Sequence, residues 1–304
     1  MNGSPALTSI AAVLRSQPVR IAFLCLGIAA ALAAMTTLRH QVRDGLSQVT
    51  VADLGATLCL SLLYLLCAAA SWRAVLSDFG GGIAARRAFR IFFLSQICKY
   101  LPGGIFSFAA AAEMGHDAGL SRRSTLSALA VTIVLTLATG TALALLLLPL
   151  ADPAALVHYW WIGFVVAAIV ALVHPAVLRR LLTLARIETI GGLSWRSIAT
   201  ASGWATVGWI TIGMQVWLLA GAIGAPLTFS TLTLATGGFA LAWVAGFLVL
   251  VAPAGFGPRE VTLTLVLASV LTPAEALVVA LLSRAVITAA ELMAAATCLV
   301  LTRR

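Results

Sequence analysis

The chain has 304 residues, of which 62% are hydrophobic and only 10% are charged, and its mean hydropathy is +1.07. Soluble domains carry about 25% charged residues, so this chain has too little polar surface to cover a fold in water. The net charge of +9 comes from arginines in short loops between apolar runs, a pattern typical of an oriented membrane protein and not of a nucleic-acid-binding one. Composition therefore excludes a soluble domain and predicts an α-helical membrane protein.

Six uncharged runs are long enough to cross a hydrocarbon core, which takes about 20 helical residues. They cover residues 21–38, 54–71, 126–150, 157–174, 198–221 and 229–252. Two further regions, 91–112 and 261–301, are hydrophobic but broken. We expect an all-α, polytopic transmembrane helical bundle of about eight membrane segments, including broken or re-entrant helices. Residues 1–304 are expected to form a single integral membrane domain without a soluble domain.

The arginines are divided unevenly between the two sides of this arrangement. With a cytoplasmic N-terminus and an incomplete crossing at 91–112, fourteen arginines face the cytoplasm and two, Arg39 and Arg43, lie outside. Such a bias sets the orientation of a membrane protein. A complete crossing at 91–112 would move Arg122 and Arg123 to the other side, so the bias favours a re-entrant or broken segment there. We expect a multi-pass protein of the bacterial cytoplasmic (inner) membrane with both termini in the cytoplasm.

Cysteine and histidine are scattered along the chain. None of the five cysteines forms a CxxC pair, and none of the four histidines has the spacing of a metal ligand. The cysteines are interpreted as small buried hydrophobic residues. No nucleotide-binding motif is present in the sequence. We therefore expect neither a metal nor another cofactor.

Two loops break the hydrophobic pattern: "KYLPGG" at 99–104 and "APAGFGPRE" at 252–260. Proline removes a backbone donor, glycine permits unusual turns, and irregular backbone at membrane depth is tolerated where protein or a water-filled cavity satisfies it. Transporters use such breaks at substrate sites, whereas a helix kink or an ordinary loop is the alternative. Pro102 and Pro253 lie almost half the chain apart, which suggests an internal repeat. However, the flanking residues agree only weakly, and the arginine count places both breaks toward the cytoplasm.

Ionisable residues lie beside both breaks. Lys99, the only lysine of the chain, precedes the first break, and Arg259 and Glu260 close the second. A charge at the membrane centre costs about 2.5–3.5 kcal/mol, so charges kept there favour a polar cavity. Snorkelling of Lys99 to the interface, and helix capping by Arg259 and Glu260, are the alternatives.

The last apolar region contains a helix start and a polar face. Thr272, Pro273 and Glu275 form the pattern of an N-cap, a first helical proline and a capping-box glutamate. Farther along, Arg284 and Glu291 share one helix face with a threonine, and this face is expected to point into the bundle. The two charged residues could pair through that threonine, a water or a lipid headgroup, or form a purely structural ion pair.

The two breaks resemble elements of the lysylphosphatidylglycerol synthase transmembrane region, the flippase-like integral membrane family. "KYLPGGIFSF" is similar to its KY-[IL]-PG element, and "PAGFGPRE" followed by "EALVVALLSRAVITAAEL" is similar to its PGG-[FL]-G-x-RE … A … R element. The resemblance covers most of the chain from about residue 50 onward. Ala254 replaces the usual second glycine, and Pro258 precedes the arginine. Because the chain stops at Arg304, directly after the last span, we expect no synthase domain and no aminoacyl transferase activity.

The resemblance implies lipid translocation. We expect a lipid flippase or transporter, not an enzyme, that moves a phospho-, aminoacylated or glycosylated lipid between leaflets through a polar cavity. The expected substrate-binding residues are Lys99, Tyr100, Pro102, Gly103, Glu113, Arg259, Glu260, Arg284 and Glu291. The three cations would face the lipid phosphate and Tyr100 would donate a hydrogen bond to it. Glu260 and Glu291 would hold the cations or accept an amino headgroup.

Two other functions are weighed against transport. One is a non-catalytic membrane subunit of a lipid or glycan biosynthesis pathway. The other is an integral-membrane lipid-linked transferase, but the chain shows no paired carboxylates, no DxD and no HxxxxD spacing. The expected partners are membrane lipids (anionic or aminoacylated phospholipid, or another polar lipid) and no nucleic acid; a homo-oligomer and a separate lipid-modifying synthase stay open.

Reporter fusions at the two termini test the orientation. Because of the arginine bias, both an N-terminal and a C-terminal fusion are expected to report the cytoplasm. A periplasmic signal from the C-terminal fusion would contradict this arrangement and the incomplete crossing at 91–112.

Overall fold

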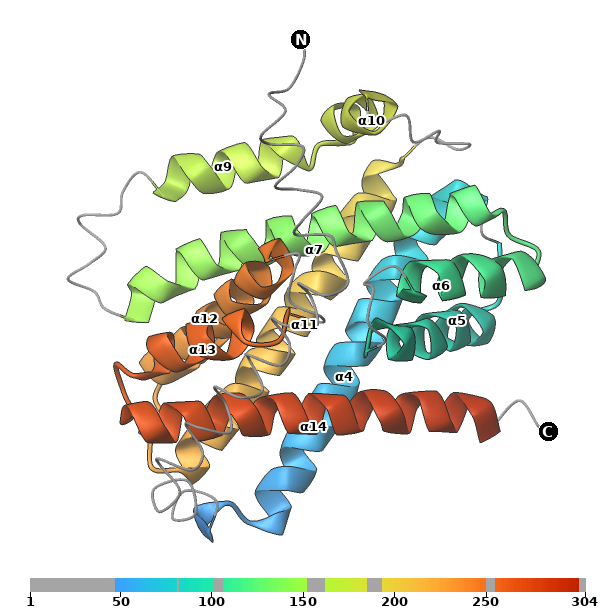
Figure 1. Cartoon of the computed structure of the whole chain (residues 1–304). Coiled ribbons are helices and arrows are strands. Elements are labelled where there is room, and N and C mark those ends of the chain that lie inside the picture. Colours follow the sequence, from blue (N-terminus) through green and yellow to red (C-terminus); the bar gives the residue numbers. More distant parts are fainter. Residues whose placement is uncertain are drawn as a thin grey trace, which may run out of the picture.

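A computed structural model describes residues 47–80, 82–100, 106–151, 162–184, 193–249 and 255–300. Their helices are α4 (Val51–Leu76), α5 (Ala85–Ile97), α6 (Phe106–Asp117), α7 (Arg122–Ala151), α9 (Ile162–Leu172), α10 (Pro175–Leu184), α11 (Trp195–Ala222), α12 (Phe229–Leu248), α13 (Pro258–Leu267) and α14 (Pro273–Val300). Two 3-10 turns, η1 (Ser77–Phe79) and η2 (Cys98–Tyr100), follow α4 and α5. Five of these helices, α4, α7, α11, α12 and α14, are long and apolar enough to cross a membrane. The expected helical membrane bundle is thus confirmed (Figure 1).

Most of the expected spans have a counterpart among the described residues. The runs 54–71, 126–150, 198–221 and 229–252 correspond to α4, α7, α11 and α12. The broken region 91–112 contains α5, η2 and α6, and the region 261–301 contains most of α13 followed by α14. The run 157–174 is described only from Ile162, where α9 has 11 residues. The run 21–38 lies outside the described residues.

Side-chain caps fix where the long helices begin. Thr50 and Asp53 exchange hydrogen bonds at the start of α4: the Thr50 amide donates to the Asp53 carboxylate (2.9 Å) and the Asp53 amide donates to the Thr50 hydroxyl (3.2 Å). The start of α14 has the predicted capping box, in which the Thr272 amide donates to the Glu275 carboxylate at 2.9 Å. Such caps satisfy backbone donors that a helix end leaves without partners.

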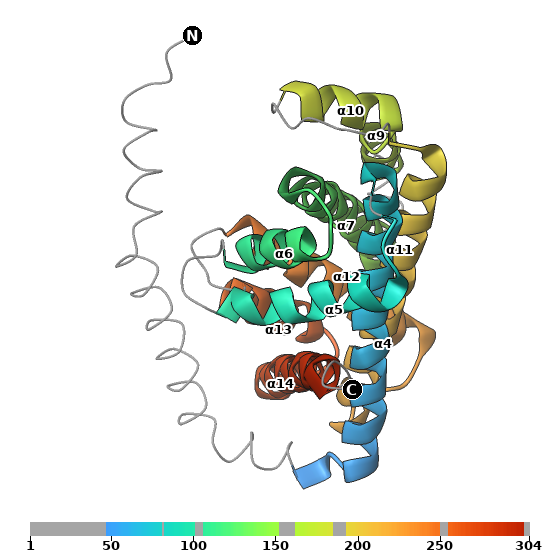
Figure 2. The same cartoon turned by 90° about the vertical axis from the view of Figure 1, so that its right-hand side faces the viewer.

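The described chain contains two halves with the same order of elements. Each has a long helix, a second helix, a break, a short helix and another long helix: α4, α5, α6 and α7 in the first half, and α11, α12, α13 and α14 in the second. The equivalent helices α4 and α11 lie side by side and run in opposite directions, and α7 and α14 also run in opposite directions (Figures 1 and 2). The two halves therefore form an inverted repeat.

Contacts between helix ends show which ends lie together. At one end of the bundle, the amide of Ser194, before α11, donates to the carboxylate of Asp78, after α4, at 2.7 Å. At the opposite end, the hydroxyl of Ser230, on α12, donates to the carbonyl of Ala151, the last residue of α7, at 2.9 Å. The loop after α11 and the loop between α13 and α14 also border one hollow there. Helix α13 therefore returns to the end from which α12 enters.

This arrangement differs from the expectation that both breaks open toward the same side. The α5–α6 hairpin enters from the end where α4 finishes, whereas the α12–α13 hairpin enters from the opposite end. The arginine count treated 229–252 as a complete crossing that delivers the second break to the cytoplasmic face. Because α13 turns back along α12 instead, the two breaks approach the middle of the bundle from opposite sides.

Each hairpin packs on both halves. Helix α5 packs against α14, and α12 packs against α7, whereas α6 packs against α7 and α13 against α14 within their own halves. Two hydrophobic clusters result, one around Trp72 and Phe92 and one around Trp209 and Phe239. Tyr64 of α4 packs against both clusters. The space between the clusters is the cavity described below.

We expect Gly213→Ala to destabilise the bundle. A methyl group at Gly213 of α11 would lie 2.7 Å from the Cα atom of Thr236 on α12, so the backbones would have to separate. Overpacking of this kind costs about 1–3 kcal/mol. The matched control is Gly203→Ala on the same helix, where an added Cβ has no neighbour within 4 Å. Thermal unfolding in detergent should show a lower Tm for Gly213→Ala only; equal Tm values would contradict this close packing.

Candidate functional site

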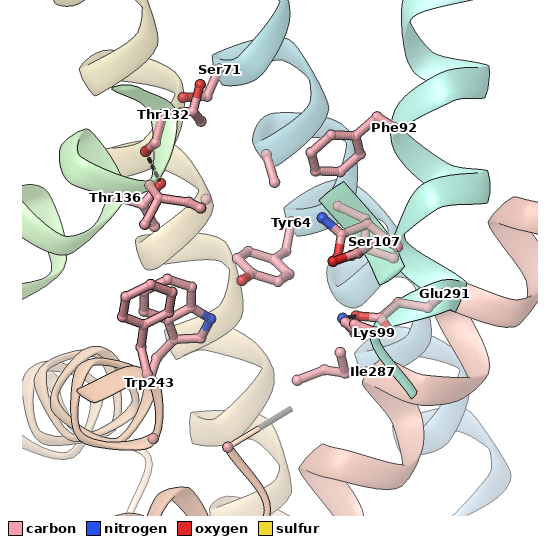
Figure 3. Close-up of a pocket in the computed structure, with 18 of the residues that line it drawn as sticks. Tyr64, Ser71, Phe92, Lys99, Ser107, Thr132, Thr136, Trp243, Ile287 and Glu291 are labelled. Atoms are coloured by element: carbon pink, nitrogen blue, oxygen red, sulfur yellow. Dashed lines mark hydrogen bonds and ion pairs between the residues drawn. The ribbon is translucent and has the colours of Figure 1, made fainter. Parts of the chain in front are cut away.

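A cavity of about 500 Å³ lies between the two halves of the bundle (Figure 3). Its lining comes from α4, α5, α6, α7, α11, α12 and α14, together with residues on both breaks. Ligand sites commonly have volumes of about 300–1,000 Å³, so this cavity is large enough for a lipid headgroup. Lys99, Arg259, Arg284 and Glu291 all line it.

Glu291 of α14 binds the end of the first hairpin. Its side chain is 6% exposed, and its Oε1 atom lies 2.5 Å from the Lys99 ammonium. Its Oε2 atom accepts a hydrogen bond from the Tyr100 hydroxyl at 2.7 Å, and that hydroxyl lies 3.2 Å from the Thr288 hydroxyl. Thr288 and Glu291 are three residues apart and hence share a helix face. Both oxygens of the carboxylate are therefore occupied by residues of η2.

The carboxylate of Glu260 makes two contacts at the second break. Its Oε2 atom accepts a hydrogen bond from the Gly257 amide at 2.6 Å, which caps the start of α13, and its Oε1 atom lies 3.7 Å from the Arg284 guanidinium. Gly257 has a φ of +95°, a conformation that favours glycine over residues with a Cβ atom. Glu260 thus caps the start of α13 and lies beside Arg284, while its buried Oε1 atom accepts no hydrogen bond from the described residues.

Arg259 is held differently from the other two cations. Its guanidinium lies 4.5 Å from the centre of the Phe239 ring, in a cation–π contact. Within the described residues, no carboxylate lies within 4.0 Å of it. The acidic residues outside the described ranges are Asp44, Asp152 and Glu188, and none of these three belongs to either break. Among the described residues, the cavity region therefore combines three cations with two carboxylates, which leaves one positive charge in excess.

The wall opposite the charges is neutral and polar. Three hydroxyl residues line it, and we call them the hydroxyl wall: Ser71, Thr132 and Thr136. Each donates its proton to a backbone carbonyl at 2.7–2.9 Å, so its oxygen keeps lone pairs that can accept a hydrogen bond. In Figure 3, Ser71, Thr132 and Thr136 lie across the cavity from Lys99 and Glu291.

The structure brings six of the predicted site residues together: Lys99, Tyr100, Arg259, Glu260, Arg284 and Glu291. For Arg284 and Glu291, whose pairing the sequence left open, the structure shows Lys99 beside Glu291 and Glu260 beside Arg284. Pro102 and Gly103 lie outside the described residues.

Glu113 does not belong to this group. It is exposed at the end of α6, where its carboxylate accepts two hydrogen bonds from the Arg122 guanidinium, at 2.7 and 2.8 Å. These bonds hold the pKa of the Glu113 carboxyl below its usual value. The pair joins α6 to the start of α7, and its position outside the cavity argues for a structural role.

Sequence reasoning missed several residues that line or support the cavity. Tyr64 lies in the middle of α4, and Phe239 supports Arg259 from α12. A phenol in the middle of an otherwise apolar span was a usable signal for Tyr64, since buried tyrosines usually need a polar partner. Thr132 and Thr136 gave no such signal, because threonines that bond their own helix are common in membrane spans.

Together these features define a multi-pass helical membrane protein with an internal charged cavity between two inverted, broken hairpins. Residues 19–294 match the family described as the lysylphosphatidylglycerol synthase TM region, and the chain belongs to this family. The suspected family is thus confirmed, for the membrane region. A comparison with curated proteins finds no match.

The Lys99–Glu291 pair predicts a stability effect. In Lys99→Met, Glu291 keeps only the Tyr100 hydrogen bond, and removing one member of a buried ion pair costs about 3–5 kcal/mol. Because the Lys99 side chain is 29% exposed, we expect a value near the lower limit. Adding Glu291→Gln to Lys99→Met should recover most of this loss, as measured by unfolding in detergent. A Lys99→Met variant as stable as the original protein would show that the pair is dispensable for folding.

Proposed function

We propose that the protein moves a polar lipid between the leaflets of the bacterial cytoplasmic membrane. The observation that carries this proposal is Arg259: a cation that lines the cavity and has no carboxylate partner in the described chain. Keeping such a charge in a membrane protein is costly, and residues of this kind usually mark substrate pathways. The family membership supports a lipid-related role for the membrane region.

A lipid phosphate could supply the negatively charged partner that Arg259 lacks among the described residues. Guanidinium presents a rigid fork of donors that fits phosphate oxygens, and it stays protonated even when partly desolvated. Arg284 lines the same cavity, so a phosphate could contact both guanidinium groups. In this proposal the headgroup occupies the cavity while the acyl chains stay in the bilayer. The protein changes the position of the lipid and makes no covalent bond to it, so the function is transport and not catalysis.

The inverted repeat supports movement across the bilayer rather than binding on one face. The two hairpins reach the cavity from opposite ends of the bundle, and both contribute to its lining: Lys99 and Tyr100 come from the first break, and Gly255 and Arg259 from the second. Inverted repeats with broken helices at a central site are typical of transporters. We therefore assign the two breaks to the two entrances of one pathway.

Transport can be tested with liposomes that contain a fluorescent phospholipid in both leaflets. Dithionite bleaches only the outer leaflet, so a protein that moves lipid should raise the bleached fraction above that of protein-free liposomes. We expect Arg259→Gln to lower the rate at least about tenfold, because a hydrogen bond to a charged group contributes about 1.5–3 kcal/mol.

The control is Arg87→Gln, which removes an exposed cation of α5 outside the cavity and should keep the original rate. Both variants should remain folded, since Arg259 has no carboxylate partner among the described residues to leave behind. Bleaching that equals the protein-free level for the unmodified protein would refute transport. Equal rates for the two arginine variants would refute the role of Arg259.

A further inference from the structure

The two walls of the cavity present different chemical groups to a ligand. The wall formed by α14 and the two breaks carries the charges, and the hydroxyl wall on α4 and α7 faces it (Figure 3). Because all three hydroxyl protons of that wall are donated to backbone carbonyls, the wall presents hydrogen-bond acceptors to the cavity. A ligand that fits both walls therefore carries a negative charge on one side and hydrogen-bond donors on the other.

Two kinds of donor could satisfy the hydroxyl wall: an ammonium group or neutral hydroxyls. The net charge of the side chains around the cavity distinguishes between these two kinds of donor. Glu291 is paired with Lys99, and Glu260 lies 3.7 Å from Arg284, so the charge of each carboxylate is already balanced by a cation of the protein. An ammonium would add to the excess charge of Arg259, and like charges brought together without compensation cost several kcal/mol. A phosphodiester has a single negative charge, which matches the excess of one positive charge.

Aromatic side chains add a surface for the uncharged part of such a headgroup. Trp243 lines the cavity, stacks on Phe247 (ring centres 5.6 Å apart) and meets Trp209 edge to face (5.5 Å). Indole rings offer apolar area on which the C–H groups of a polyol or sugar can pack. An indole face also attracts cations, so the aromatic group alone does not distinguish the two kinds of donor. The distinction comes from the net charge.

Resting on the proposed transport function, we infer that the headgroup is an anionic phosphodiester bearing a neutral polyol or sugar, and that aminoacylated headgroups are disfavoured. The phosphate binds Arg259 and Arg284, and the hydroxyls of the headgroup donate to the hydroxyl wall. This reverses the role that the sequence suggested for Glu260 and Glu291 as acceptors of an amino headgroup, since both are engaged with cations of the protein.

Lipid retention tests this inference without requiring transport. The full chain is placed in nanodiscs with equal amounts of phosphatidylglycerol (anionic, two hydroxyls), phosphatidylethanolamine (no net charge) and lysyl-phosphatidylglycerol (cationic). The lipids retained after release from the nanodisc are then measured by native mass spectrometry. We expect phosphatidylglycerol to exceed lysyl-phosphatidylglycerol by about tenfold or more. Equal retention of the three lipids, or a preference for the lysyl lipid, would overturn the inference.

A matched pair of variants tests the hydroxyl wall. The double variant Thr132→Val/Thr136→Val keeps the side-chain shape and removes two acceptors; their hydroxyl protons bond only carbonyls of α7 itself. The preference for phosphatidylglycerol over phosphatidylethanolamine should fall several-fold, because one hydrogen bond contributes about a factor of 2–10. The control, Thr297→Val, removes an exposed α14 hydroxyl that bonds the Met293 carbonyl in the same way. An unchanged preference in the double variant would refute the role of the wall.

The outcomes for transport and for headgroup recognition are separable. Selective retention of phosphatidylglycerol without any movement across the bilayer would refute transport and leave the headgroup assignment standing. Transport of all three lipids at equal rates, with unselective retention, would refute the assignment and leave transport standing. Should the threonine variants fail to fold, the competition among the three lipids in the unmodified protein still decides the inference.

Discussion

A carboxylate cannot stay ionised in a hydrocarbon interior without a partner, and this constraint organises the centre of the molecule. Glu291 of α14 meets it by binding Lys99 and Tyr100, and Glu260 meets it by binding the Gly257 amide and Arg284. Each pair joins one break to the last helix. The position of both breaks is consequently determined by charge compensation as well as by apolar packing, and the cavity exists because the breaks are held at its edge.

The inverted repeat explains how these charges reach one place. Each hairpin packs on the last long helix of the other half as well as on its own. The contact between halves brings η2 of the first half against α14 of the second, where Lys99 meets Glu291. The repeat is nevertheless unequal in chemistry. The position of α14 on one wall is taken by α7 on the other, and there the lining residues are Thr132 and Thr136 instead of charged ones.

The sequence predicted the helical bundle and most of the charged cluster because rare features carry strong signals. A single lysine beside a Pro-Gly-Gly break, and Arg284 and Glu291 in an apolar helix, are costly in a membrane and hence informative. The pairing of these residues could not be predicted, since it depends on how two hairpins turn back inside the bundle. Counting arginines misplaced the second break for the same reason: α12 has the length of a complete crossing, and only its contact with α13 shows the return.

Common residues were the hardest to interpret. Serines and threonines that bond their own backbone occur throughout membrane helices, so those of the hydroxyl wall look like any others until the fold gathers them. Glu113 is the opposite case, because it was predicted for the site but does not line the cavity. A carboxylate near a break is suggestive, but Arg122 lies just across the turn between α6 and α7 and binds it outside the cavity.

The Lys99–Glu291 pair also bears on the order in which the protein is assembled. The two residues are 192 positions apart, and chains are synthesised at about 5–20 residues per second. Lys99 therefore leaves the ribosome roughly 10–40 s before its carboxylate exists. During that interval its ammonium has no partner from α14, and the cost of a lone charge opposes placing the tip of the first hairpin at depth. Although Lys99 is encoded in the first half of the chain, its ion pair can therefore form only after α14 has been synthesised.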